Sequence, residues 1–205
     1  SRPAPKQAIS ELLCRAGQRR EFRAHGLRAT AGGVLLVASP NLSAVEGAPK
    51  VLFQVVHALH GALVNRSSIV VVSASDGELR EEYERLGIRV HIIRGFSSEG
   101  QSWSRYHRSM SELALVCADS EPGAVLANVI DSFWGVDFAR RRGIPSAWIV
   151  HESVEPAARF GGQDPRVRLL FLEALRTVQQ PLFVSQRTAE LFLPHIGAKH
   201  LVIEN

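Results

Sequence analysis

A histidine and a glutamate stand side by side directly after a short apolar segment of the chain. The segment covers residues 143–150, and His151 and Glu152 follow it. A short apolar run of this kind is typical of a buried strand. Because ligands bind at the carboxyl ends of strands in open α/β sheets, we interpret His151 and Glu152 as candidate catalytic residues. The alternative is that His151 is a structural histidine with a satisfied hydrogen bond.

A glycine-containing segment follows the first predicted strand and opens the first predicted helix. Glycine lets a backbone approach a ligand closely, and proline suits the start of a helix. The free N–H groups and the dipole at a helix N-terminus favour a phosphate group. The candidate substrate-binding residues in this segment are Glu46, Gly47, Ala48 and Lys50. The alternative is a strand-to-helix turn without a ligand.

Two further polar residues, Asn128 and Ser185, each follow a predicted strand. We predict that both bind substrate, because they face the same crevice as His151 in a doubly wound sheet. The alternative for each is the N-cap of a following helix, a position that asparagine and serine fill well.

The elements that must position these residues alternate along the chain. The predicted strands cover residues 34–38, 69–72, 88–93, 124–127, 147–150, 182–184 and 201–203. The predicted helices cover residues 49–63, 78–86, 103–117, 132–142, 166–177 and 187–193. Because the strands are continuous apolar runs, the sequence predicts a parallel sheet covered by helices on both faces. The expected fold is α/β, a Rossmann-like doubly wound parallel sheet.

Composition and charge narrow the classes of protein. A chain of 205 residues with 45% hydrophobic residues suits one globular domain with a short appendage. Residues 1–30 hold seven basic and two acidic residues, whereas the rest of the chain is nearly neutral, which does not support a nucleic-acid-binding surface. We expect residues 1–30 to be a basic leader helix on the inner membrane face or a linker helix packed on its own domain.

Residues 31–205 would form the Rossmann-like domain. Cys14 and Cys117 are the only cysteines, and no Cys/His spacing fits a metal site. We therefore expect a cytoplasmic protein without a bound metal.

Several common motifs are missing from the sequence. No GxGxxG follows a strand, no GxxxxGK[ST] occurs, and neither GxSxG nor Asp-x-Asp is present. The segment His151–Glu155 carries Glu155 where a zinc protease has its second histidine. These absences count against dinucleotide-dependent enzymes, P-loop NTPases, serine hydrolases and zinc proteases.

The order of several short motifs resembles the retaining GT-B glycosyltransferases, a family often called group-1 or family-four. The resemblance spans residues 33–205. It rests on the Glu46-Gly47-Ala48-Pro49 loop, Asp76-Gly77-Glu78-Leu79, Val125-Leu126-Ala127-Asn128, the Gly143-Ile144-Pro145 to His151 run, Val184-Ser185 and Val202-Ile203-Glu204-Asn205. Members typically open with a Gly-Gly-Ala-Glu-like loop, whereas this chain has one glycine there and Pro49 in place of the acidic residue.

The resemblance implies an amino-terminal, acceptor-side domain of an enzyme that transfers a sugar from a nucleotide-diphosphate donor with retention. It implies a glycan or lipid-linked cell-envelope acceptor, no obligatory metal and no other cofactor. The Gly47 loop would contact the diphosphate or the acceptor. His151 would bond the donor sugar or stabilise charge near the anomeric carbon, and Glu152 would orient His151 or contact an acceptor.

In this family a second Rossmann-like domain follows the hinge at residues 202–205 and holds most of the donor contacts. The 205-residue chain alone is therefore expected to fold but to be inactive. Two other interpretations stay open. One is a nucleotide-binding Rossmann enzyme of the epimerase or dehydrogenase type, and the other is a non-catalytic scaffold derived from a glycosyltransferase.

Overall fold

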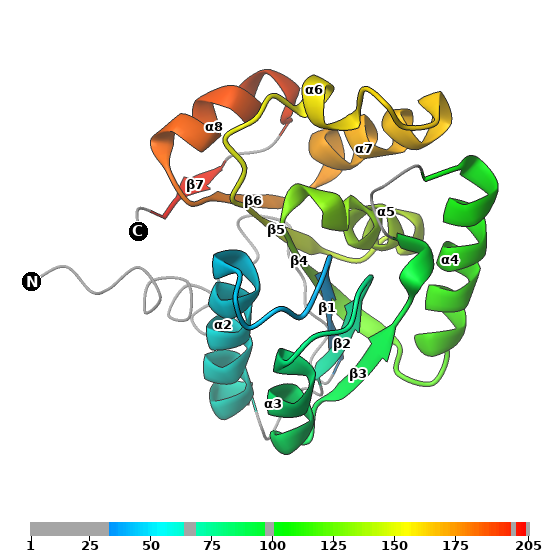
Figure 1. Ribbon diagram of the computed structural model, residues 1–205, viewed down its shortest axis with the longest axis vertical. Coiled ribbons are helices and arrows are strands. Elements are labelled where there is room, and N and C mark those ends of the chain that lie inside the picture. Colours follow the sequence, from blue (N-terminus) through cyan, green and yellow to red (C-terminus); the bar gives the residue numbers. More distant parts are fainter. Residues whose placement is uncertain (1–32, 64–68, 97–100, 198–199, 204–205) are drawn as a thin grey trace, which may run out of the picture.

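The computed structural model describes residues 33–63, 69–96, 101–197 and 200–203, and it contains a sheet of seven parallel strands. The strand order is β3-β2-β1-β4-β5-β6-β7 (Figure 1). The strands are β1 (Val34–Ser39), β2 (Ile69–Ser73), β3 (Arg89–Ile92), β4 (Pro122–Asn128), β5 (Ser146–Val150), β6 (Gln180–Phe183) and β7 (Leu201–Val202). The order reverses between β1 and β4, so the sheet is doubly wound around that point.

Alternating strand residues face opposite sides of the sheet, as a period of two requires. In β1, Leu36 and Ala38 belong to one hydrophobic cluster and Val37 belongs to the other. In β5, Trp148 belongs to the same cluster as Leu36 and Ala38, and Ile149 belongs to the same cluster as Val37. Because both faces are apolar, both must be covered, which explains the continuous apolar runs.

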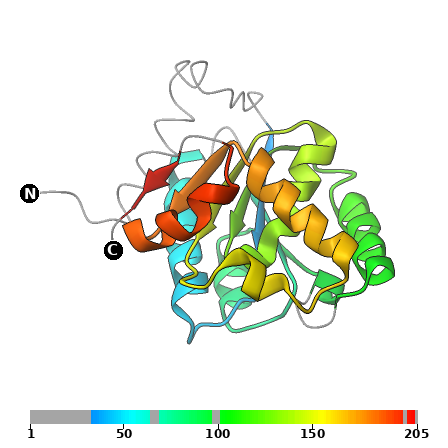
Figure 2. The same cartoon turned by 90° about the horizontal axis from the view of Figure 1, so that it is seen from above.

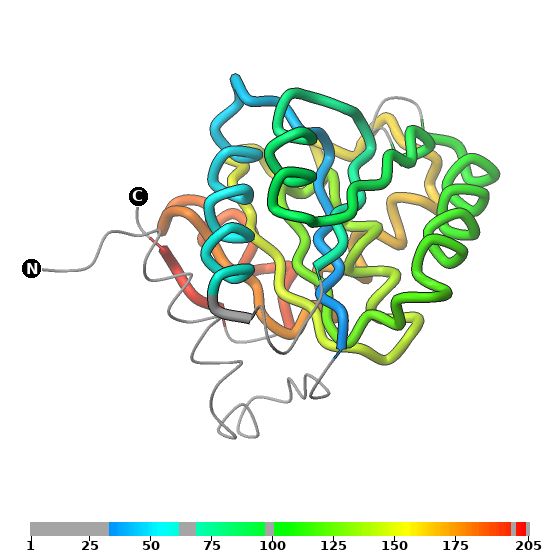
Figure 3. Tube along the Cα trace, turned by 90° about the horizontal axis from the view of Figure 1, so that it is seen from below, coloured from blue at the N-terminus to red at the C-terminus, as the bar shows by residue number. Residues whose placement is uncertain are grey.

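Helices cover the two faces of the sheet. One face is covered by α2 (Gly47–Leu63) and α3 (Leu79–Arg85). The other face packs against α4 (Trp103–Val116), α5 (Phe133–Arg142), α6 (Pro156–Phe160), α7 (Pro165–Thr177) and α8 (Gln186–Phe192). Figures 2 and 3 show the two helical layers with β1 running between α2 and α4. Short 3-10 helices, η2 (Arg94–Phe96), η3 (Ile130–Ser132) and η4 (Leu193–His195), follow β3, β4 and α8.

The predicted fold class is confirmed, and the differences concern the ends and the short elements. Helix α2 begins at Gly47, two residues before the predicted start. Helix α6 was not predicted, because five residues are too few to show a helical period. The predicted basic helix in residues 1–30 lies outside the described residues. None of the helices in the described part of the chain is long and apolar enough to span a membrane.

Helix α5 approaches β1 unusually closely at Gly135. A Cβ atom added to Gly135 would lie 2.6 Å from the Cβ of Ala38. The Ala38 side chain is a single methyl group fixed to the strand, so it cannot rotate away. Gly135 therefore sets the distance between the first turns of α5 and the centre of the sheet.

We predict that Gly135→Ala lowers the free energy of unfolding by about 1–3 kcal/mol, because the new methyl group forces α5 away from β1. Chemical denaturation measures the loss. The matched control is Gly61→Ala on α2, where an added Cβ meets nothing within 4 Å. That variant should be more stable than the parent by up to about 1 kcal/mol. Equal effects of the two substitutions would contradict the close approach.

Candidate functional site

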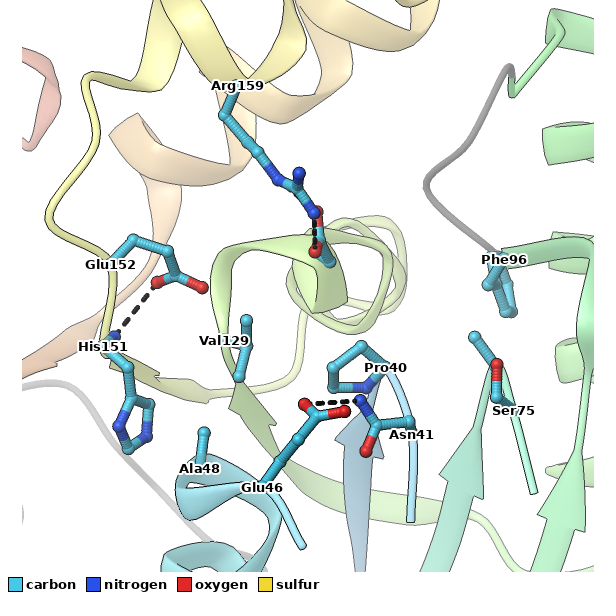
Figure 4. A pocket seen from close by; sticks show the side chains of 12 residues that line it. Pro40, Asn41, Glu46, Ala48, Ser75, Phe96, Val129, His151, Glu152 and Arg159 are labelled. Atoms are coloured by element: carbon cyan, nitrogen blue, oxygen red, sulfur yellow. Dashed lines mark hydrogen bonds and ion pairs between the residues drawn. The ribbon is translucent and has the colours of Figure 1, made fainter. Parts of the chain in front are cut away.

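A pocket of about 400 Å³ opens at the carboxyl edge of the sheet, across the point where the strand order reverses (Figure 4). It is lined by residues that follow β1, β2, β3, β4 and β5. They are Pro40, Asn41, Glu46, Ala48, Ala74, Ser75, Phe96, Val129, Asp131, His151, Glu152 and Arg159. Such a crevice is where open α/β sheets bind ligands. The structure thus brings together four of the predicted site residues, Glu46, Ala48, His151 and Glu152.

A buried asparagine connects His151 to the first turn of α2. Asn128 is the last residue of β4 and its side chain is fully buried. Its amide nitrogen Nδ2 donates to the Ala48 carbonyl oxygen at 3.2 Å. Its oxygen Oδ1 lies 2.9 Å from Nε2 of His151. Asn128 therefore does not cap a helix, and it lies beneath the pocket rather than among the residues that line it.

Burial keeps the His151 ring neutral. Desolvation lowers the pKa of His151 from 6.5 to about 4. The ring is thus an uncharged hydrogen-bonding group at neutral pH.

The Glu152 side chain folds back onto the backbone at the ends of β4 and β5. Its Oε1 accepts the Ile130 N–H at 2.8 Å, and its Oε2 accepts the His151 N–H at 3.0 Å. Desolvation raises the pKa of Glu152 from 4.5 to about 7, although these two amides act in the opposite direction. Glu152 therefore orients the His151 backbone, whereas Asn128 is the partner of the ring. A carboxyl group with a pKa near neutral suits proton transfer.

Val129 holds a strained backbone conformation on the pocket wall. Its φ is 67° and its ψ is 150°, a combination that glycine adopts readily and that is an outlier for a β-branched residue. Both of its backbone polar groups are held: its N–H donates to the Ile149 carbonyl at 2.8 Å, and its carbonyl accepts from Trp148 Nε1 at 2.8 Å. The resulting turn points the next N–H, of Ile130, at Glu152. Strain of this kind clusters at functional sites.

An ion pair closes another side of the pocket. Arg159 on α6 bonds the Asp131 carboxylate through both Nε, at 3.3 Å, and Nη2, at 2.6 Å. Sequence reasoning missed both residues, because α6 is short and Asp131 lies in a 3-10 turn. Their separation of 28 positions leaves no local pattern to indicate the contact.

The loop between β1 and α2 is held by its own side chains. Asn41 Oδ1 accepts the Ser43 N–H at 3.0 Å, and Asn41 Nδ2 donates to Glu46 Oε2 at 3.1 Å. Gly47 then starts α2 in an exposed position, where an added Cβ would meet nothing within 4 Å. Lys50 is exposed too, and neither Gly47 nor Lys50 is among the residues that line the pocket.

Ser185 lies outside the pocket and caps α8. Its Oγ accepts the Thr188 N–H at 3.0 Å. This is the N-cap alternative that the sequence left open for Ser185. Within the ranges that the structure describes, no group of three or more His, Cys, Asp or Glu side chains could hold a metal ion.

Comparison with known proteins gives a match of fold. No protein-family model matches the sequence, and a search of curated proteins gave no match. Among solved structures, Alr3699/HepE from Anabaena in complex with UDP is similar with a TM-score of 0.57 and 15% identity. The match covers 84% of this chain and 44% of that one. The same protein is also solved with UDP and glucose, with a TM-score of 0.56 and 14% identity.

A putative UDP-N-acetylglucosamine 2-epimerase from Listeria monocytogenes is similar with a TM-score of 0.50 and 15% identity, over 79% of this chain and 41% of that one. The match thus covers less than half the length of the HepE and epimerase chains. These likenesses agree with the Rossmann-like α/β fold described above.

We predict that Val129→Gly leaves the free energy of unfolding nearly unchanged, because a gain offsets two losses. The gain is the relief of backbone strain at the positive φ. The losses are the contacts of the valine side chain and the greater conformational entropy that glycine gives the unfolded chain. The matched control is Val90→Gly, at a half-buried position in β3, which pairs with β2 in one continuous register. Without strain to relieve, that change should cost about 1–2 kcal/mol more than Val129→Gly in chemical denaturation. Equal losses at the two sites would show that Val129 is not strained.

We also predict opposite pH dependences for His151 and Glu152. Between about pH 4.5 and 7 the folded protein holds a proton on Glu152 that the unfolded chain releases, so this group lowers stability as the pH rises. Between about pH 4 and 6.5 the unfolded chain binds a proton at His151 that the folded protein does not, so this group raises stability as the pH rises. The two contributions largely cancel in the parent protein.

Glu152→Gln should unmask the His151 contribution. The stability of this variant relative to the parent is expected to increase by about 3 kcal/mol from pH 4.5 to pH 8. Denaturant unfolding at several pH values measures the difference, and His151→Gln should give the opposite slope. A difference between parent and Glu152→Gln that stays constant with pH would refute the raised pKa of Glu152.

Proposed function

We propose that this chain is the amino-terminal, acceptor-side domain of a retaining GT-B glycosyltransferase. The proposed reaction transfers a sugar from a nucleotide-diphosphate donor to a glycan or a lipid-linked cell-envelope acceptor. One observation carries the proposal. The pocket at the reversal of strand order brings the open first turn of α2 next to the His151–Glu152 pair.

The fold supports this proposal. The solved HepE structures hold UDP, or UDP and glucose, and this chain covers 44% of their length. We propose that a second Rossmann-like domain completes the site and supplies most of the nucleotide contacts. The reaction would take place in the cleft between the two domains.

The start of α2 suits the donor diphosphate. This 17-residue helix has no acidic residue in its first turn, and the carboxylate of Glu46, the residue before the helix, accepts a hydrogen bond from Asn41. Gly47 leaves space for the ligand, and the N-terminal N–H groups of the helix favour phosphate oxygens. Exposed Lys50 adds a positive charge one turn further along.

Other residues of the pocket suit the sugars. His151 would hydrogen-bond the donor sugar, and Glu152, with its pKa near 7, would contact the acceptor hydroxyl and accept its proton. Pro40 gives the pocket apolar surface against which a sugar ring can pack. The proposal requires no metal and no cofactor, and it places the enzyme in the cytoplasm with residues 1–30 on the inner membrane face.

A second candidate function is epimerisation of a nucleotide sugar. The similarity to the Listeria UDP-N-acetylglucosamine 2-epimerase favours this alternative. The two activities differ in their products. Epimerisation inverts a carbon of the sugar and needs no acceptor, whereas transfer releases the nucleoside diphosphate and forms a new glycosidic bond.

Gly47→Ala tests the proposed donor site. UDP-glucose added to the 15N-labelled chain should shift the amide signals of Gly47, Ala48, His151 and Glu152. The added methyl group would occupy the space reserved for the ligand, so we expect the variant to bind at least about tenfold more weakly. Its free energy of unfolding should be unchanged or raised by up to about 1 kcal/mol, because an added Cβ meets no atom within 4 Å.

Gly61→Ala is the matched control, since it makes the same change on the same helix about 20 Å away and should leave binding unaltered. NAD added in place of UDP-glucose should leave the pocket signals unshifted. Equal binding of UDP-glucose by the parent and Gly47→Ala would refute the donor site at α2. Shifts with NAD at the same residues would favour a dehydrogenase.

A further inference from the structure

The hydrogen bonds of Asn128 fix the orientation of its side-chain amide. The Ala48 carbonyl oxygen can only accept a hydrogen bond, so the Asn128 atom that faces it at 3.2 Å must be the amide nitrogen. The amide oxygen then faces His151 Nε2 at 2.9 Å. Because the Asn128 side chain is fully buried, water does not compete for either contact.

This orientation decides where the hydrogen of the His151 ring resides. A bare Nε2 would place a lone pair against the Asn128 oxygen, with two acceptors facing each other at 2.9 Å. An Nε2–H group instead completes a chain of hydrogen bonds from His151 through Asn128 to Ala48. We propose that Asn128 is a positioning residue, which holds neutral His151 with its hydrogen on Nε2 and its lone pair on Nδ1.

The proposal predicts whether the ligand group that contacts His151 donates or accepts a hydrogen bond. No residue in the described part of the chain has a hydrogen bond to Nδ1, and the His151 side chain lines the pocket. A lone pair on Nδ1 accepts a hydrogen bond, so the ligand group there must carry a hydrogen. A hydroxyl or an amine meets this requirement, whereas the oxygens of an ionised phosphate are repelled.

This inference rests on the proposed function only in one step, the identification of the ligand group as a sugar hydroxyl. The position of the ring hydrogen is a property of the chain alone and is tested without any enzyme activity. The ionisable side chains besides His151 that line the same pocket are Glu46, Asp131, Glu152 and Arg159. The contact to the ring nitrogen comes from uncharged Asn128, so the hydrogen on Nε2 does not depend on the ionisation of those groups.

The test is 15N NMR of the histidine rings in the 205-residue chain. The chain contains eight histidines, and His151→Gln identifies the signals of His151. We expect a neutral ring from pH 6 to 8 with the hydrogen on Nε2, exchanging slowly with water. A hydrogen on Nδ1, or a doubly protonated ring at pH 7, would overturn the proposal without any variant.

Two variants test whether Asn128 is responsible. Asn128→Ala should speed exchange of the Nε2 hydrogen by about tenfold or more and allow some hydrogen on Nδ1. Asn128→Asp should raise the pH at which His151 becomes protonated by about 1 to 3 units, because a carboxylate stabilises the charged ring. Asn41→Ala is the control: Asn41 also lines the pocket but bonds Glu46, so the His151 signals should not change.

Two-dimensional amide spectra show whether each variant is folded. His151 signals that stay the same in folded Asn128→Ala and folded Asn128→Asp would refute the role of Asn128.

Sulfate, an anion that carries no hydrogen at pH 7, provides the last comparison. Titration of the parent chain with sulfate at pH 7 should leave the His151 ring signals in place, because Nδ1 offers no hydrogen. A sulfate-induced shift with protonation of the ring would overturn the proposal. Equal binding of UDP-glucose by the parent and Gly47→Ala would refute the proposed donor site while the His151 ring signals still reported on Asn128, so the two failures are distinguishable.

Discussion

All seven strands run in one direction, and the position of the site follows from that constraint. A parallel strand needs a crossover connection, and here each helix returns the chain so that the next strand starts at the same edge. The carboxyl ends of the strands and the N-termini of the helices therefore meet on one side of the molecule. Only where the order reverses, between β1 and β4, do neighbouring connections depart to opposite faces and leave a crevice.

Desolvation dominates the electrostatics of this crevice. His151 is a base and its neighbour Glu152 is an acid. Burial lowers the pKa of His151 and raises the pKa of Glu152, so that it favours the neutral form of each side chain. The hydrogen bonds around them are made by uncharged groups, namely backbone amides for Glu152 and the Asn128 amide for His151. Hydrogen bonds to uncharged groups therefore hold the pair, and no ion pair between the two side chains is needed.

The sequence predicts the fold and part of the site, and the reasons for each outcome are physical. Strand and helix periodicity is a local signal, so the seven strands and the six longer helices could be predicted, as could the placement of His151 and Glu152 at a strand end. The contacts of Asn128 with Ala48 and of Arg159 with Asp131 join segments 80 and 28 positions apart, which no local pattern reveals. Asn128 and Ser185 both stand at the end of a predicted strand, and either residue type can cap a helix, so the sequence did not distinguish their roles. In the structure Asn128 bonds His151, whereas Ser185 caps a helix.

The packing of Gly135 against Ala38 reaches beyond the core. Gly135 is the third residue of α5, and the turn η3 that precedes this helix carries Asp131, the partner of Arg159 on the pocket wall. A bulkier residue at 135 would push out the first turn of α5 and carry that wall with it. Gly135 is not among the residues that line the pocket, yet its close packing against Ala38 helps to fix where this part of the pocket wall lies.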